Sequence, residues 1–328
     1  MRKSFLELHH EFERVLLNLG FSPERADACA QIFTQNSCDG VYSHGLNRFP
    51  VFIGDIKKGY IDIHASPKLV KSMGVIEQWD GQLGLGVLNA QFCMQRAIEL
   101  AKQNGMGCVA LKNTNHWMRG GTYGWQAADA GCIGINFTNT IGIMPPWGGK
   151  SPAIGNNPLI IAVPRKEGHI VLDMAMSQFS YGKMQEAELK NQELPYFGGY
   201  DNADQLTRDP KIIQQNKRSL PIGFWKGSGL AMMLDLLATL LSGGKSTGAI
   251  TQTGEEKGVS QVYICFDLET YENSEALINQ ILTFTNSADK INDAEITYPG
   301  ERTLQTRKYN LANGIPVDEK MWAVLLSL

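Results

Sequence analysis

Apolar side chains recur at helical spacing through the first sixty residues, and they predict three helices over residues 4–20, 22–40 and 49–58. A serine with an acidic residue soon after it opens each of the first two helices, and a glycine closes all three. Three short helices make a small lobe and not a whole fold. The side chains that we expect to face inward from the first two helices are Leu8, Phe12, Val15, Leu16, Ala26, Cys29 and Phe33.

From residue 68 onward the pattern changes to short apolar runs divided by glycine. Strands that alternate with helices in this way predict an α/β architecture. A polar segment over residues 189–218 reads as a long excursion or lid, and two further helices are expected after residue 300. The predicted strands are 105–111, 132–138, 158–163, 169–174 and 261–268, and the predicted helices between them are 88–103, 122–130 and 229–241.

The chain of 328 residues is long enough for two parts with a large core. We expect a helical lobe formed by residues 1–65 together with 303–328. Residues 66–302 would form the α/β domain.

Composition and charge narrow the class of protein. Hydrophobic residues make up 43% of the chain and charged residues 19%, which is typical of a globular protein and too apolar for disorder. The net charge is −3 and the basic residues are spread out, so we expect no nucleic-acid or membrane partner. The first helix begins without an apolar signal core, and no apolar run reaches membrane-spanning length, so we expect a cytoplasmic protein.

The six cysteines are scattered, with no C-x-x-C pair and no histidine at ligand spacing. This arrangement predicts neither a zinc site nor a disulfide framework, and we expect no bound metal. Most of the cysteines lie in apolar runs and are expected to be buried as small hydrophobic side chains. They are Cys29, Cys38, Cys93, Cys108, Cys132 and Cys265.

The turn between the second and third predicted helices carries the most concentrated chemistry. Ser43, His44 and Arg48 place a hydroxyl, an imidazole and a guanidinium within six residues. An imidazole titrates near neutral pH and a planar guanidinium matches a carboxylate, so the turn indicates acid–base chemistry on an anionic substrate. The residues by themselves leave a second interpretation open, an ordinary surface turn with one satisfied histidine and one solvated arginine.

Four other segments offer chemistry together with a plainer alternative. Residues 115–121 follow a strand and contain His116 and a second arginine, but such a loop also caps helices. Residues 221–229 form a glycine-rich helix start suited to a phosphate, although glycine is common there for steric reasons. Asp173 ends a strand and would orient an imidazole, hold a ribose hydroxyl or cap a turn. The turn at 299–302 carries a charged pair that is equally typical of a solvated helix start.

Two glycine motifs resemble nucleotide-binding signatures and fail on inspection. Residues 84–90 have asparagine at the third glycine position of a dinucleotide fingerprint, and no acidic residue ends the next strand. A tight turn and helix start is therefore the better interpretation. Residues 244–247 resemble the end of a phosphate-binding loop, but the upstream glycine position is Thr239 and a helix precedes it.

Taken together, the motifs resemble the type-2 malate/L-lactate dehydrogenase family, also described as L-sulfolactate dehydrogenase-like. The resemblance runs over essentially the whole chain, and the S-H-G turn is its mark. The matching motifs are Y-S-H-G-x-N-R-F at 42–49, N-H-W-M-R-G-G at 115–121, M-P-P-W-G at 144–148, G-N-N-P-L at 155–159, D-M-A-M-S at 173–177 and W-K-G-S-G at 225–229.

The resemblance implies a non-Rossmann fold with a mixed sheet, and a homodimer with its site near the subunit contact. It implies NAD(H), or NADP(H), as cofactor and His44 as proton donor. On that basis we expect Arg48, Ser43 and His116 to bind the substrate. The residues expected to bind the cofactor are His169, Ile170, Val171, Leu172, Asp173, Met174, Ala175, Trp225, Lys226, Gly300, Glu301 and Arg302.

Residues 115–121 with Trp225-Lys226 are similar to the members of the family that reduce a sugar acid, 2,3-diketo-L-gulonate, to 3-dehydro-L-gulonate. Two alternatives stay within the same class of enzyme, a malate- or lactate-type 2-hydroxy acid dehydrogenase and a cyclic imino acid reductase. A sugar-acid binding protein without chemistry is an alternative of a different class. The preference between NADH and NADPH stays open, because no fingerprint acidic residue is present to read the ribose.

Overall fold

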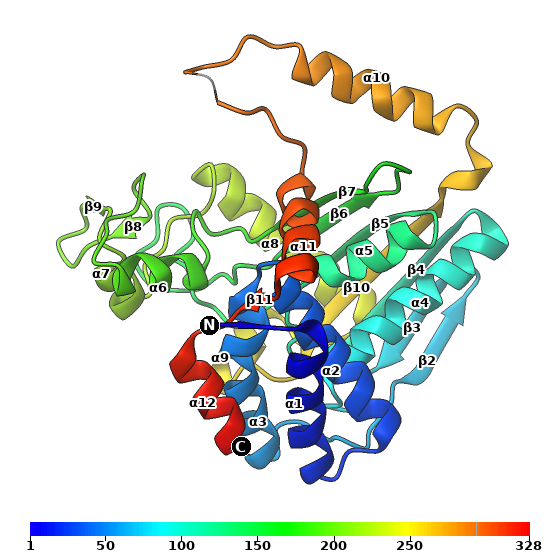
Figure 1. Ribbon diagram of the computed structural model, residues 1–328, viewed down its shortest axis with the longest axis horizontal. Helices are drawn as coiled ribbons and strands as arrows, with labels where there is room; N and C mark the ends of the chain where they lie inside the picture. Colours follow the sequence, from blue (N-terminus) through cyan, green and yellow to red (C-terminus); the bar gives the residue numbers. More distant parts are fainter. Residues whose placement is uncertain (293) are drawn as a thin grey trace.

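A seven-stranded mixed sheet lies at the centre of the protein in this computed structural model, which describes residues 1–292 and 294–328 (Figure 1). The strand order is β2-β3-β4-β10-β5-β6-β7. β3 and β4 run parallel, and the other neighbouring pairs run antiparallel. The strands are β2 (Lys68–Met73), β3 (Ile76–Asp80), β4 (Met106–Thr114), β5 (Cys132–Thr138), β6 (Leu159–Val163), β7 (Ile170–Met174) and β10 (Val259–Asp267).

Helices cover both faces of this sheet. Successive side chains of a strand point to opposite faces, so Val109 and Leu111 of β4 join one buried cluster while Cys108 and Ala110 join another. The first cluster packs under α4 (Gly86–Asn104) and α5 (Gly121–Asp129), and the second packs under α8 (Trp225–Ser242). Burial on both faces explains why the central strands read as continuous apolar runs.

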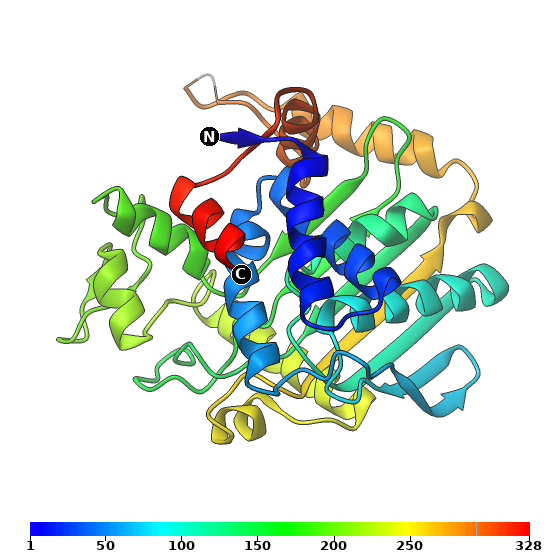
Figure 2. The same cartoon turned by 60° about the horizontal axis from the view of Figure 1, so that its bottom comes forward.

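The helical lobe is built from both ends of the chain, which lie side by side (Figure 2). Its aromatic core brings Phe12, Phe33, Phe49 and Phe52 to ring-centroid distances of 4.5–6.2 Å. A short strand at the N-terminus pairs antiparallel with one that precedes the last helix. The elements are β1 (Arg2–Lys3), α1 (Phe5–Asn18), α2 (Pro23–Cys38), α3 (Phe49–Lys57), α11 (Glu301–Asn313), β11 (Ile315–Pro316) and α12 (Glu319–Ser327).

Most of the elements predicted from the sequence are confirmed. The capping box at Ser4 and Glu7 is formed, and all seven residues expected to face inward from the first two helices are buried. All six cysteines are buried and unpaired. The division into a lobe of 1–65 with 303–328 and a domain of 66–302 stays a prediction, and the lobe's buried cluster also contains Leu85, Val87 and Met118.

The polar segment at 189–218 has structure of its own. Its side chains Leu194 and Ile213 share a small buried cluster with Met184 and Ala187 of the preceding helix. Several short elements were not predicted from the sequence, and neither was an isolated helix, α10, that stands away from the sheet (Figure 1). These unpredicted elements are α6 (Tyr181–Leu189), β8 (Gly199–Tyr200), β9 (Leu206–Thr207), α7 (Pro210–Asn216), α9 (Thr247–Gln252), η3 (Leu268–Thr270) and α10 (Ser274–Asn286).

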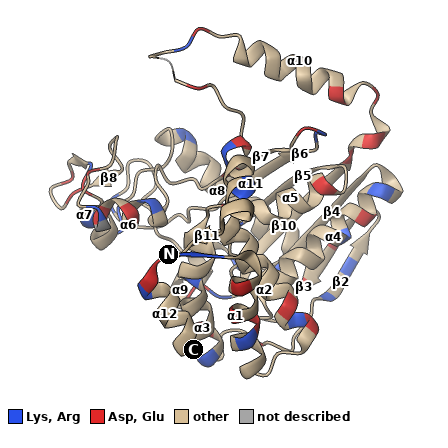
Figure 3. Ribbon diagram, in the orientation of Figure 1, with Lys and Arg blue, Asp and Glu red and all other residues tan. Residues whose placement is uncertain are grey.

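Basic and acidic residues are interspersed along the helices and loops on the face shown in Figure 3. Among the described residues, no helix combines the length and the apolar character needed to cross a bilayer.

Candidate active site

The turn that carries His44 consists of two 3₁₀ turns, η1 (Tyr42–His44) and η2 (Leu46–Arg48), joined by Gly45. It is fastened to α2 by hydrogen bonds from the Asn36 side-chain amide to the His44 carbonyl, 3.0 Å, and from the Leu46 amide to the Ser37 hydroxyl, 3.0 Å. A Cβ atom at Gly45 would lie 2.2 Å from that hydroxyl, so only glycine allows the turn to approach the helix this closely. The position of His44 is therefore fixed by its backbone.

The structure brings His44 and His116 together. Their rings are stacked, with centroids 5.8 Å apart and planes inclined by 10°. The Ser43 hydroxyl lies 3.1 Å from Nδ1 of His44. The Met118 amide donates to Nδ1 of His116 at 3.0 Å, so in the neutral ring the proton is on Nε2, which is left as a donor.

Both imidazoles are neutral at neutral pH when the site is empty of substrate. The pKa of His44 is lowered to about 4, chiefly by burial; the Asp173 carboxylate opposes this shift, while Arg48 and Arg119 add to it. Burial also lowers the pKa of His116 well below its ordinary value, and the nearby Arg48 adds to the effect. Arg48 is thus an electrostatic neighbour of both rings.

The loop between β4 and α5 holds His116 in place. The Asn115 side-chain amide donates to the carbonyls of Leu83 and Gly84, at 2.7 and 3.0 Å. At the first residue of α4, a Cβ atom on Gly86 would lie 2.3 Å from both the Asn115 and the His116 carbonyl oxygens. The glycine motif at 84–90 is thus a tight turn and helix start, as predicted, and it lets α4 begin directly against the His116 loop.

Arg48 and His116 line a cavity of about 260 Å³ between the helical lobe and the segments that follow β4 and precede β10. The Arg48 side chain forms no hydrogen bond or ion pair with any residue that the structure describes, although carboxylates line the same cavity. Its guanidinium is therefore available to an anionic ligand. Asn115 and Met118, from the segment 115–121 singled out in the sequence, also line the cavity. The rest of the lining was not singled out from the sequence, because it comes from segments far apart in the chain: Val51, Phe52, Asp55, Lys58, Tyr60, Ile61, Glu255 and Glu256.

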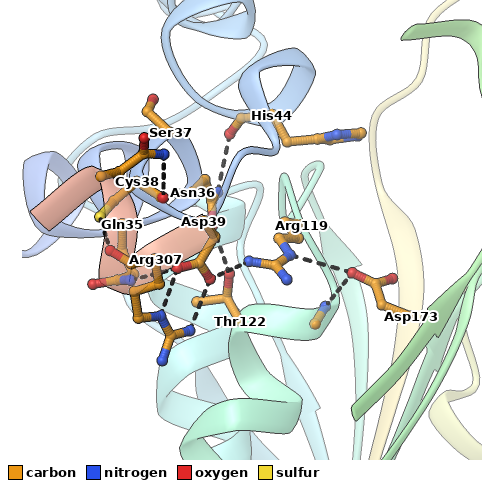
Figure 4. Close-up of polar contacts among 12 residues, drawn as sticks. Gln35, Asn36, Ser37, Cys38, Asp39, His44, Arg119, Thr122, Asp173 and Arg307 are labelled. Carbon is orange, nitrogen blue, oxygen red and sulfur yellow. Dashed lines mark hydrogen bonds and ion pairs between the residues drawn. The ribbon is translucent and has the colours of Figure 1, made fainter. Parts of the chain in front are cut away.

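A buried ionic network connects the end of α2, just before the turn that carries His44, with β7 (Figure 4). Asp39, at the end of α2, accepts from Nε and Nη2 of Arg307 at 2.7 and 2.8 Å and also pairs with Arg119. Arg119 reaches Asp173 at 3.4 Å, and the Gly121 amide donates to the same Asp173 oxygen at 3.0 Å. Burial acts to raise the pKa of Asp39, but the two guanidinium groups more than offset it and hold the pKa below its ordinary value. Neither Asp39 nor Arg307 was identified from the sequence.

The three segments predicted to hold a cofactor meet along β7, the edge strand of the sheet. The Val171 amide donates to the Pro299 carbonyl at 2.9 Å, which brings in the turn at 300–302. Just beyond the strand, the Ile222 amide donates to the Met176 carbonyl at 2.8 Å, which brings in the start of α8 with Trp225 and Lys226. Two segments that are distant in the sequence therefore lie beside β7 and the residues that follow it.

Individual side chains in these segments have different surroundings. Trp225 is 65% exposed and Lys226 lies 5.9 Å from its ring centroid. His169, just before β7, pairs with the Asp129 carboxylate at 2.9 Å. Glu301 accepts from the Tyr298 amide at 3.2 Å and so closes its own turn. Asp173 is the β7 residue whose side chain joins the ionic network.

The arrangement fits a dinucleotide. At the start of the long helix α8 the amides of Lys226 and Gly227 donate to the carbonyls of Gly223 and Ile222, at 3.2 and 2.8 Å, so the exposed side chain of Lys226 is the group left there to meet an anion. Gly300 has φ of +90°, and a Cβ there would lie 3.0 Å from the Val171 amide, so the turn approaches β7 as closely as backbone allows. The sheet itself is mixed and has no glycine-rich fingerprint at a strand end, which agrees with a non-Rossmann fold.

Comparison with known proteins decides the family. The model of the malate/L-lactate dehydrogenase family matches residues 4–326. The chain belongs to this family. It is 46% identical to a 2,3-diketo-L-gulonate reductase of Citrobacter koseri, with both chains covered completely.

Solved structures of the family share the fold. The malate dehydrogenase of Entamoeba histolytica has a TM-score of 0.95 at 24% identity and covers the whole chain and 96% of its own. The sulfolactate dehydrogenase of Methanocaldococcus jannaschii has a TM-score of 0.88 at 29% identity, with 99% and 95% covered. The protein is thus an oxidoreductase of a dehydrogenase family, which implies a nicotinamide cofactor.

Proposed function

We propose that the protein reduces 2,3-diketo-L-gulonate to 3-dehydro-L-gulonate with NADH or NADPH, at the C2 carbonyl. The observation that carries the proposal is the stacked pair His44 and His116 beside a cavity in which the Arg48 side chain has no ionic partner among the described residues. The relatives that match over their full length bear the name of this activity.

The reduced nicotinamide, when bound, supplies the hydride. Arg48 holds the C1 carboxylate of the substrate through a two-pronged hydrogen bond, which fixes the adjacent carbonyl. His44 gives a proton to the carbonyl oxygen, and general acid help of this kind contributes roughly 10²–10⁴-fold. Ser43 orients the His44 ring through Nδ1, and Nε2 of His116 donates to the carbonyl or to a sugar hydroxyl.

The low pKa of His44 in the free site has a consequence for this mechanism. A neutral imidazole must take up a proton before it acts as an acid. The positive charge of Arg48 is one of the causes that keep the His44 pKa low, and a bound carboxylate neutralises that charge. Substrate binding therefore favours the protonated form of His44 at the moment when the proton is needed.

We propose that the cofactor lies along the β7 edge, where its three predicted segments meet. The residues that would hold it are His169, Ile170, Val171, Leu172, Asp173, Met174, Ala175, Trp225, Lys226, Gly300, Glu301 and Arg302. The rates of NADH and NADPH oxidation in the assay below distinguish the two cofactors.

The test is the oxidation of NADH and of NADPH with a panel of acids: 2,3-diketo-L-gulonate, pyruvate, oxaloacetate and a cyclic imino acid. We expect the highest kcat/KM with the diketo sugar acid. His44→Ala should lose turnover by about 10²–10⁴-fold while the enhancement of NADH fluorescence on binding persists. The exposed His64→Ala is the matched control and should keep both.

Near-normal turnover in His44→Ala would remove the proton-donor role. Preference for oxaloacetate or pyruvate would favour a malate- or lactate-type enzyme, and preference for the imine a cyclic imino acid reductase. If the protein only binds a sugar acid and has no cofactor, NADH fluorescence will not be enhanced when the protein is added.

We also propose that the protein forms a homodimer. Helix α8 exposes Leu240 (72%) and several other apolar side chains, and α10 exposes Phe284 (81%) with no residue buried. Exposed apolar faces of this extent are unfavourable in a monomer. Sedimentation equilibrium of the purified protein tests this, and a monomer at micromolar concentration would contradict it. The cytoplasmic location stays a prediction.

A further inference from the structure

The cavity beside His116 is lined by three carboxylates that the mechanism does not use. Asp55 comes from α3, and Glu255 and Glu256 come from the segment between α9 and β10. Glu256 and His116 also line a second, much smaller cavity together, so the two residues are neighbours. The carboxylates therefore line the same space as Arg48 and His116.

These carboxylates are not equally engaged. Glu255 accepts from the Tyr60 hydroxyl at 3.0 Å. Asp55 and Glu256 form no ion pair with the described residues, even though Arg48 and Lys58 line the same cavity. Both carboxyl groups retain oxygen atoms that can accept from a ligand in the cavity.

The surroundings of Asp55 and Glu256 are already unfavourable for negative charge. Burial raises the pKa of Glu256, with Asp55 adding to the effect and Arg48 opposing it. Burial likewise raises the pKa of Asp55, with Arg48 and Lys58 opposing and Glu255 adding. A further negative charge placed here would meet the same burial and the same repulsion.

The lining of the cavity thus imposes two requirements on a substrate. Arg48 and His116 suit a carboxylate next to a carbonyl. Asp55, Glu255 and Glu256 can accept hydrogen bonds from hydroxyl groups, whereas a second carboxylate would meet groups of like charge. A 2-keto acid with a hydroxylated, uncharged tail satisfies both requirements, and a 2-keto dicarboxylate satisfies only one.

We propose that Asp55 and Glu256 are specificity-determining residues, which select 2-keto acids with a hydroxyl-bearing tail and reject 2-keto dicarboxylates. The inference rests on the proposed function, since it takes the C1 carboxylate to lie at Arg48. It adds residues and a physical reason for discrimination against malate-type substrates that the family relationship by itself does not supply.

The experiment is calorimetric binding at saturating NAD⁺, where neither keto acid is reduced. The probes are 2,3-diketo-L-gulonate and oxaloacetate, titrated into the wild type, Glu256→Gln and Asp55→Asn. We expect the wild type to bind the sugar acid more tightly. In each variant the ratio of the two dissociation constants should shift toward oxaloacetate by roughly 10-fold or more, because a like charge is removed and a hydrogen-bond acceptor is weakened. Glu272→Gln, an exposed carboxylate outside the cavity, should leave the ratio unchanged.

A ratio that stays constant in both cavity variants overturns the proposal, and so does a wild type that binds oxaloacetate as well as the sugar acid or binds neither. Turnover is measured separately with NADH. If binding shows the expected preference but no NADH is oxidised, the proposed function fails while the selectivity of the cavity stands. If the sugar acid is reduced but the ratio does not shift, the function stands and this inference fails.

Discussion

Replacing Asp39 by asparagine removes a negative charge that two arginines share in the interior. The Asp39 side chain is 1% exposed and that of Arg119 is 5% exposed. Arg307 donates to both Asp39 oxygens, at 2.7 and 2.8 Å. After the substitution Arg119 keeps only Asp173 as an ionic partner, at 3.4 Å. A nearly fully buried cation is then left with one long contact.

The expected loss of stability follows from this geometry. Removing one partner from a buried ion pair typically costs about 3–5 kcal/mol, because the other charge stays buried without compensation. Unfolding entropy near 60 °C is roughly 2.1 cal/mol/K per residue, or roughly 0.7 kcal/mol/K for a chain of 328 residues. The melting temperature should therefore fall by about 4–7 °C if the chain unfolds as one unit.

The effect should also depend on pH with a definite sign. The pKa of Asp39 in the folded protein lies below its ordinary value, so the charge stabilises the wild type above the unfolded pKa of about 3.9. That stabilisation is lost as the pH falls through the folded pKa, whereas asparagine has no proton to gain. The gap between wild type and Asp39→Asn should therefore narrow in acid.

Urea unfolding at pH 7 and at a series of lower pH values measures both effects. The matched control is Asp27→Asn in α2, since the Asp27 side chain is 65% exposed and pairs with His9 at 3.2 Å. Such a surface change should stay within about 0.5 kcal/mol. A loss below about 1 kcal/mol at pH 7, or a gap that does not change with pH, would refute the reasoning.

Two other substitutions probe the site. Arg48→Lys should raise KM for the keto acid by roughly 10-fold or more, because lysine lacks the planar fork that binds a carboxylate at two points, while NADH binding is unchanged; an unaltered KM would count against the carboxylate clamp. Gly86→Ala should cost about 1–3 kcal/mol and lower kcat/KM, because the new Cβ would lie 2.3 Å from the His116 carbonyl. Gly54→Ala in α3 has nothing within 4 Å of its added Cβ, so thermal melting of both variants should show a loss only for Gly86→Ala.

The sequence could predict those features that depend on neighbours along the chain. Caps and apolar spacing located the helices of the lobe, because a helix is stabilised by contacts three and four residues apart. The continuous apolar run of β5 was predicted with the same bounds that the structure shows, residues 132–138. Helix α10 was missed because none of its residues is buried, so it has no apolar face packed against the rest of this chain.

The site itself was predictable only in part. Ser43, His44 and Arg48 lie in one turn, so their chemistry was visible in a single short stretch. The stacking of His44 on His116 was not, because it depends on Gly86 allowing a loop seventy residues away to approach. The family resemblance supplied the cofactor segments as separate motifs, and only the structure showed that they meet on β7.

Sequence alone therefore determined the local elements, the chemistry of the S-H-G turn and, through its motifs, the family. Tertiary structure decided which charges face one another. Asp39, Arg119 and Arg307 lie up to 268 residues apart and meet because burial of charge requires a partner. Asp55 and Glu256 come to share one cavity with Arg48 only because the lobe packs against the segments that follow β4 and precede β10. Contacts of this kind leave no periodic signal along a chain, since their spacing is set by the fold and not by the geometry of a helix or strand.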